Sequence, residues 1–192
     1  MWRCFPWDPD AADGAAFSPS YIVPGQTVGR FALNDRPPVR YLADTPEHAI
    51  GEALGPFRGT TFVPAYLRQQ GHPFALVDVT LASELVHRIP DCTDPTILSA
   101  LGLRPDELAH HDRKLTQEIA RRVHSGVPSR GILARPYAGL RWWSALTGAW
   151  HTTVVFTDRV HPGEVIFGSP RQLESGDAAV LRALSILGIR RR

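Results

Sequence analysis

The pattern of apolar and polar positions predicts a short strand followed directly by an amphipathic helix near the first quarter of the chain. Residues 39–43, V-R-Y-L-A, alternate apolar and mixed side chains, which indicates a short, largely buried strand. Thr45 is expected to cap the following helix, with Pro46 at its first position and Glu47 at the positive end of its dipole. Asp44 with Glu47 makes an alternative capping box, so the start is defined to within one residue.

This helix is predicted to end at Gly55-Pro56 and to bury one stripe of side chains. The stripe consists of Ala49, Ile50, Ala53 and Leu54. At about 100° per residue, Glu52 lies roughly 60° from Ala49, at the rim of the stripe. A carboxylate in that position can be half-buried and still face a cleft, so Glu52 is a candidate functional residue.

The rest of the chain mixes strands and helices without strict alternation, which favours an α+β fold with mostly antiparallel pairing. Strands are expected at residues 2–5, 74–81, 85–89, 131–134, 152–157 and 164–167, and helices at 95–101, 112–126 and 177–187. Segment 6–27 is rich in Pro, Asp, Gly and Ser and predicts an ordered loop. The basic residues 190–192 are expected to fray.

Composition narrows the class of protein. A chain of 192 residues with 43% hydrophobic and 21% charged side chains predicts one domain over residues 1–192. A net charge of +2 argues against a protein that coats nucleic acid or a membrane surface. Without a secretory pattern or an apolar run of about 20 residues, a cytoplasmic protein is expected. Cys4 and Cys92 form no C-x-x-C pair, which argues against a disulfide scaffold or a cysteine-only zinc site.

Several common chemistries lack their motifs. Ser144, His151 and Asp158 could form an acyl-transfer triad, but no G-x-S-x-G surrounds the serine. His110-His111 before Asp112 has no second ligand pair at metal-binding spacing, so no metal site is expected. Neither of the usual glycine-rich phosphate loops is present. A phosphorylated ligand would therefore have to be held by arginine side chains.

A set of short motifs resembles the RES-domain family, named for its Arg, Glu and Ser. They are G-R-F at 29–31, V-R-Y-L-A at 39–43, A-x-x-E at 49–52, G-L-R-W-W-S at 139–144 and T-V-V-F-T-D at 153–158, in the family's order and spacing. The resemblance runs over roughly Trp2 to Asp158. In this resemblance the family's early Arg falls on Arg3 and its G-R motif on Gly29-Arg30. Its aromatic residue falls on Tyr41, its Glu on Glu52 and its Ser on Ser144. The chain departs from the family's common G-R-W-N at Phe31-Ala32, and Cys4 replaces a frequent aromatic.

The resemblance implies a fold, an activity and a partner. The implied fold is an ADP-ribosyltransferase-like core of two small, mostly antiparallel sheets with flanking helices. The implied activity is cleavage of the nicotinamide–ribose bond of NAD by a toxin of a toxin–antitoxin pair. NAD is then a substrate, no cofactor is expected, and inorganic phosphate is a candidate co-substrate. The implied partner is a helix-turn-helix antitoxin of the Xre type that blocks the active site.

Elementary chemistry is consistent with these implied roles. Loss of nicotinamide leaves a cation-like ribose, which the Glu52 carboxylate can stabilise. Arg3 and Arg30 suit a diphosphate because guanidinium groups bind it in bidentate fashion. Tyr41 offers a stacking surface, although core packing is its plain alternative, and Ser144 can hydrogen-bond ribose or diphosphate. The resemblance therefore assigns Glu52, Arg3 and Ser144 to catalysis, and Arg3, Arg30, Tyr41 and Ser144 to NAD binding.

Other readings stay open at this stage. The same residues could support transfer of ADP-ribose to a protein, because the sequence does not select between water, phosphate and a protein side chain as acceptor. A catalytically silent domain that only binds a partner is a further alternative. Taken without the resemblance, Arg3 is more simply a solvated N-terminal residue.

Overall fold

The computed structural model describes the chain except for residues 26–28, 33–37, 110–111, 127–136 and 192. It forms two compact units, each assembled from separate segments of the sequence. Unit 1 consists of Met1–Tyr21, Leu42–Thr80 and Ile166–Arg192, and unit 2 of Ile22–Tyr41 and Leu81–Val165. This division does not decide whether the chain is one domain, so the single domain over residues 1–192 stays a prediction.

Unit 1 is built around two long antiparallel strands, β1 (Trp2–Pro6) and β4 (His72–Leu81). They pair over the whole length of β1. The N-terminal ammonium of Met1 extends this pairing by donating a hydrogen bond to the carbonyl oxygen of Val79 at 2.8 Å. The first residues of the chain are therefore fixed in a sheet.

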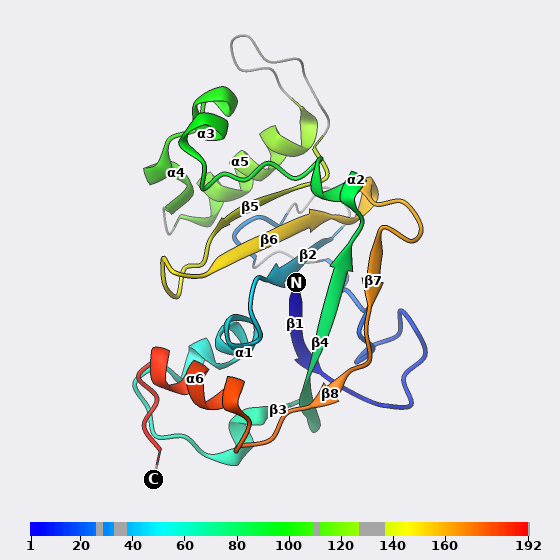
Figure 1. Ribbon diagram of the computed structural model, residues 1–192, viewed down its shortest axis with the longest axis vertical. Coiled ribbons are helices and arrows are strands. Elements are labelled where there is room, and N and C mark those ends of the chain that lie inside the picture. The colour runs from blue at the N-terminus through cyan, green and yellow to red at the C-terminus, as the bar shows by residue number, and fades with distance from the viewer. Residues whose placement is uncertain (26–28, 33–37, 110–111, 127–136, 192) are drawn as a thin grey trace. The chain divides into compact units, whose positions relative to one another are not determined.

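Shorter elements complete unit 1. The strands are β3 (Arg68–Gln69) and β8 (Arg171–Gln172), which pair with β4, and the last residues of two strands that begin in unit 2. These are β2 (Val39–Ala43), whose Ala43 pairs with β1, and β7 (Val165–Phe167), which pairs with β4. The helices are α1 (Pro46–Leu54) and α6 (Ala178–Ile186). The 3₁₀ turn η1 (Gly55–Phe57) follows α1, and a second 3₁₀ turn, η2 (Pro64–Leu67), precedes β3. Helices α1 and α6 lie side by side, and α1 also packs on β1 (Figure 1).

Unit 2 contains the antiparallel pair β5 (Gly139–Trp143) and β6 (His151–Phe156), with helix α5 (Arg113–Ser125) packed on β5. Its shorter elements are α2 (Ser83–Val86), α3 (Pro95–Leu101), α4 (Pro105–Ala109) and η3 (Thr157–Arg159). The core of this unit joins apolar side chains of these elements, including Leu98, Leu108, Ile119, Leu140, Trp142, Val154 and Phe156. The mixture of helices and antiparallel strands confirms the predicted α+β class.

The helices with strong local capping signals form where the sequence predicts them. Asp94 caps α3 by accepting a hydrogen bond from the Thr96 amide at 2.7 Å. Asp112 caps α5 by accepting one from the Lys114 amide at 2.8 Å. Gly126 ends α5 at a φ of 63°, a left-handed conformation that glycine adopts without a steric penalty.

Other local predictions are wrong. The strand expected at residues 85–89 is instead helix α2 with a following turn, because Leu85 is fully buried and the His87 amide donates back to the Ser83 carbonyl at 3.0 Å. Arg190 does not fray: its amide donates to Thr60 and its carbonyl accepts from Phe62. The strand expected at 131–134 lies outside the described residues.

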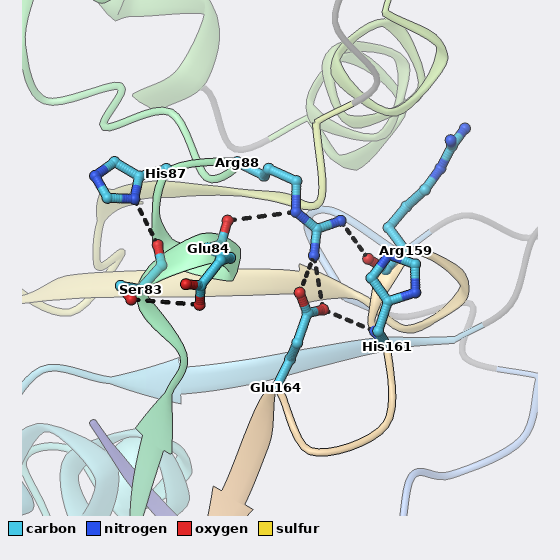
Figure 2. Close-up of polar contacts among 7 residues, drawn as sticks. All are labelled: Ser83, Glu84, His87, Arg88, Arg159, His161 and Glu164. Carbon is cyan, nitrogen blue, oxygen red and sulfur yellow. Dashed lines mark hydrogen bonds and ion pairs between the residues drawn. The ribbon is translucent and has the colours of Figure 1, made fainter.

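The loop that precedes β7 is joined to α2 by an ion pair (Figure 2). The guanidinium of Arg88 donates to both carboxylate oxygens of Glu164, at 2.5 and 2.6 Å, and to the Arg159 carbonyl at 2.8 Å. A hydrogen bond from the His161 amide and the charge of Arg88 hold the pKa of Glu164 below its usual range, against the opposing effect of burial. This ion pair is structural and lies within unit 2.

Among the helices in the described part of the chain, none is long and apolar enough to cross a membrane.

Candidate functional site

Arg3 lies on β1 and is held by the loop that follows this strand. Its guanidinium donates to the carbonyl oxygens of Pro19 and Tyr21, and it lies 5.3 Å from the centroid of the Phe5 ring. The plain alternative of a solvated N-terminal arginine is therefore wrong. These two carbonyl oxygens fix the direction of the Arg3 guanidinium.

Glu52 lies on α1, whose start is set by Thr45. The Thr45 hydroxyl accepts a hydrogen bond from the His48 amide at 3.2 Å, which selects Thr45 rather than Asp44 as the N-cap. Ile50 and Leu54 are completely buried, whereas the side chain of Glu52 is 47% exposed. Its predicted position at the rim of the buried stripe is confirmed.

The end of α1 is confirmed, and its buried stripe differs in detail from the prediction. The helix ends at Leu54 with Gly55 as its C-cap, and the chain continues into η1. The buried face includes His48 and Gly51, while Ala53 is only half-buried. His48 is the important addition, because it is a buried ring on the face that carries Glu52.

His48 is a residue that the sequence reasoning missed. Its ring is 0% exposed and lies between two carboxylates, Asp44 at 2.9 Å and Glu52 at 3.1 Å. The spacing D-x-x-x-H-x-x-x-E is the signal in the sequence: His48 and Glu52 are four residues apart on one helical face, and Asp44 directly precedes the N-cap.

Arg30 and Tyr41 belong to unit 2 and are linked through the backbone around Gly29. The Tyr41 hydroxyl accepts a hydrogen bond from the Phe31 amide at 3.0 Å. The Arg30 guanidinium donates to the Leu108 carbonyl and lies 5.5 Å from the centroid of the Phe31 ring. The G-R motif and the aromatic of β2 are therefore one local arrangement.

The backbone at Gly29 and Arg30 is also hydrogen-bonded to side chains of α5. The Thr116 hydroxyl donates to the Arg30 carbonyl at 2.5 Å, and the side-chain Nε2 of Gln117 donates to the Gly29 carbonyl at 3.1 Å. Thr116 is completely buried. These contacts fix the main chain from which the Arg30 side chain projects.

Ser144 follows β5 and is nearly buried, with 8% of its surface exposed. Its amide donates to the Trp150 carbonyl at 2.8 Å, and its hydroxyl accepts a hydrogen bond from the Leu146 amide at 3.0 Å. These bonds hold the turn between β5 and β6. The five predicted site residues thus divide into Arg3 and Glu52 in unit 1, and Arg30, Tyr41 and Ser144 in unit 2.

The alternative chemistries gain no support from the geometry. Asp158 contacts Nε2 of His124 at 2.8 Å, which gives this carboxylate a structural partner outside the supposed triad. Among the described residues, no group of His, Cys, Asp and Glu could hold a metal ion, and His110-His111 lie outside them. Burial raises the pKa of the Cys4 and Cys92 thiols to about 12, so neither is a thiolate nucleophile at neutral pH.

Arg141, the arginine of the G-L-R-W-W-S motif, is part of an ion pair. Its guanidinium donates to Asp91 at 2.6 Å. Partial burial raises the pKa of Asp91, but hydrogen bonds from Thr93 and the charge of Arg141 outweigh it and lower this pKa overall. Asp91 is thus ionised at neutral pH and is the ion-pair partner of Arg141.

Comparisons with known proteins identify the family. No curated protein matches the chain significantly. Among solved structures, the chain is similar to the crystal structure of the M. tuberculosis MbcT–MbcA toxin–antitoxin complex, with a TM-score of 0.58 and 17% identity over 97% of this chain and 87% of that chain. At that identity the likeness concerns the fold alone. A model of the RES domain matches residues 1–177, so the chain belongs to the RES-domain family.

Proposed function

We propose that this protein is the toxin of a toxin–antitoxin pair and that it cleaves the nicotinamide–ribose bond of NAD. The observation that carries the proposal is the match to the RES domain over residues 1–177, a span that includes all five candidate residues. The likeness in fold to a chain of the MbcT–MbcA toxin–antitoxin complex supports the toxin role.

Glu52 is the residue proposed to promote bond cleavage. As the bond between C1′ of ribose and nicotinamide breaks, nicotinamide leaves as a neutral molecule and positive charge develops on the ribose. A carboxylate that is already in place stabilises this charge without reorganisation. The half-exposed position of Glu52 on α1 is suited to this, because the carboxylate is anchored to the helix and still open to a ligand.

Arg3 and Arg30 are proposed to bind the diphosphate of NAD, Tyr41 to stack on a flat ring, and Ser144 to hydrogen-bond the ribose or the diphosphate. Arg3 is oriented by the Tyr21 carbonyl at 2.5 Å and Arg30 by the Leu108 carbonyl. Water or inorganic phosphate then adds to C1′, giving ADP-ribose or its 1″-phosphate.

Nicotinamide release from NAD by the purified protein tests this function directly. We expect wild-type protein to release nicotinamide, and Glu52→Gln to lose at least about a hundredfold in kcat, because the change removes the charge and keeps the shape. Running the assay with and without phosphate identifies the acceptor, and adding candidate proteins tests ADP-ribose transfer.

The melting temperature of Glu52→Gln is the control for folding. Unchanged turnover in a variant that melts like wild type would remove Glu52 from the mechanism. Failure of folded wild-type protein to release nicotinamide under all of these conditions would contradict the proposed activity itself and would favour a silent binding domain.

A further inference from the structure

His48 lies in the middle of a row of three side chains at the start of α1. Its Nδ1 lies 2.9 Å from Oδ1 of Asp44, and its Nε2 lies 3.1 Å from Oε1 of Glu52. His48 and Glu52 are four residues apart on α1 and share a face, whereas Asp44 directly precedes the N-cap Thr45 and contacts the ring from outside the helix. Because helical side chains lean towards the N-terminus, Glu52 reaches back to His48 and His48 to Asp44.

Solvent exposure differs sharply along this row. The side chain of Glu52 is 47% exposed and that of Asp44 is 22% exposed, whereas the ring of His48 is 0% exposed. A fully buried ring cannot touch a ligand, so His48 is not a catalytic residue. Contacts at both ring nitrogens fix the orientation of the imidazole, and through Nε2 they fix one oxygen of the Glu52 carboxylate.

The protons that the row holds decide how many of the two contacts are hydrogen bonds. Ionised carboxylates only accept hydrogen bonds, and a neutral imidazole has a single N–H to donate. Two hydrogen bonds therefore require one further proton among the three groups, whereas a single hydrogen bond and one close contact require none.

We propose that His48 is a positioning residue that holds the Glu52 carboxylate in its reactive orientation, with Asp44 holding the ring. The inference rests on the proposed function, because it concerns the geometry of the group that stabilises the ribose cation. Preorganised charge is effective in catalysis only when its position is set before the bond breaks. A second residue that holds the reactive carboxylate in position is therefore needed. Metal ligands are held in the same way by hydrogen-bonded neighbours.

Two amide substitutions separate the two ring contacts. The amide nitrogen of glutamine lies near the place of Nε2, and that of asparagine lies near the place of Nδ1. We expect His48→Gln to keep the bond to Glu52 and most of kcat. His48→Asn keeps the bond to Asp44 and loses the bond to Glu52, so its kcat should fall by about tenfold or more with a smaller change in KM.

His124 provides a matched control, because it is also buried and its Nε2 also contacts an aspartate, Asp158, at 2.8 Å. We expect His124→Asn to lower the melting temperature and to leave kcat of the folded protein within about twofold of wild type. Equal losses of kcat in His48→Asn and His48→Gln, or an equal loss in His124→Asn, would overturn the positioning role, because each indicates a general effect of disturbing a buried histidine.

A double-mutant cycle tests whether His48 acts through Glu52. If it does, His48→Asn should have little further effect on kcat in a protein that already carries Glu52→Gln. A full additional tenfold loss in that background would contradict the proposal. Because turnover in the Glu52→Gln background is low, nicotinamide release is measured in a single turnover at high protein concentration.

Nitrogen-15 NMR of the histidine side chains gives a readout that needs no NAD cleavage. We expect both ring nitrogens of His48 in wild-type protein to give hydrogen-bonded signals, with Nε2 shifted in Glu52→Gln and Nδ1 shifted in Asp44→Asn. An unshifted Nε2 signal in Glu52→Gln would overturn the inference. This test can be made even if His48→Asn fails to fold. A protein with the expected signals but no NAD cleavage would contradict the proposed function and leave the Asp44–His48–Glu52 row established.

Discussion

Gly29 is so close to Tyr41 that a larger residue does not fit at its position. A Cβ on Gly29 would lie 2.2 Å from the Tyr41 hydroxyl oxygen and 2.9 Å from Cζ of the ring. The same hydroxyl accepts the hydrogen bond from the Phe31 amide at 3.0 Å. The glycine of the G-R motif is therefore required by the tyrosine on β2, and together they set the backbone of Arg30.

We expect Gly29→Ala to destabilise the protein by about 1–3 kcal/mol, because the added methyl group displaces the Tyr41 ring from a packed site. For a chain of this size, each kcal/mol lowers the melting temperature by about 2–4 °C. In the double variant with Tyr41→Phe the loss should be smaller than the sum of the single losses, because the nearest clashing atom is gone. Strict additivity in thermal unfolding would show that the two positions are independent.

At the scale of residues, the sequence identified side chains but not their contacts. Motifs indicate Arg3, Arg30, Tyr41, Glu52 and Ser144 as candidates, and the exposure of Glu52 follows from helical geometry. That Arg3 is held by carbonyl oxygens of the loop after β1 could not be predicted, because no periodic pattern relates residue 3 to residues 19 and 21. His48 could have been found from its spacing, since i and i+4 neighbours meet on any helix.

The Arg88–Glu164 ion pair connects two elements that are far apart in the sequence (Figure 2). The pKa of Glu164 is lowered in the folded protein, so ionised Glu164 stabilises the fold at pH values above its unfolded pKa of about 4.3. This contribution is lost as the pH falls through the lower, folded pKa. We expect Glu164→Gln to reduce the free energy of unfolding at pH 7, and the difference from wild type to shrink between about pH 4 and the folded pKa.

Urea unfolding at a series of pH values measures this difference. Glu118→Gln is the matched control, because Glu118 pairs with Arg121 at 2.5 Å on the surface of α5 and is 56% exposed. Exposed helix pairs contribute little to stability, so the control should show a small and nearly pH-independent effect. Equal pH dependence in both variants would mean that the Arg88 contact does not stabilise the fold.

At the scale of elements, the helices predicted correctly are those whose ends are set by residues close together in the sequence. The caps Asp94, Asp112 and Thr45 act within a single turn of helix, so a local pattern was sufficient. Residues 85–89 were wrongly predicted as a strand, since the amides of Val86 and His87 donate to carbonyls four residues earlier in the chain, as in a helix. Arg190 was expected to fray because its partners, Thr60 and Phe62, belong to a segment that gave no clear pattern.

For the whole molecule, the proposed function requires a means of keeping the enzyme silent in its own cell. An inhibitor of Xre type that presents a carboxylate could bind the same guanidinium groups as the diphosphate, because both are planar or multidentate anions. We therefore expect antitoxin and NAD to bind in a mutually exclusive manner. Titrating NAD against Glu52→Gln protein, alone and in complex, measures the competition without turnover.

An antitoxin in which the contacting acidic residues are replaced by amides is the control for this competition. We expect it to bind the toxin more weakly and to be displaced by NAD at lower concentration. Equal affinity for NAD with and without the intact partner would contradict direct exclusion, and any inhibition would then have to act through a change of conformation.

The interleaving of the two units has a consequence for the order of events during synthesis. Unit 1 combines Met1–Tyr21 and Leu42–Thr80 with Ile166–Arg192, and its α1 packs against α6. The whole of unit 2 is translated before the last of these segments. The helix that carries Glu52 therefore lacks its packing partner on a nascent chain, and a ribosome that stalls before residue 166 releases no complete unit 1. If the proposed function is correct, the packing of the helix that carries Glu52 is completed only after residues 178–186 have been translated.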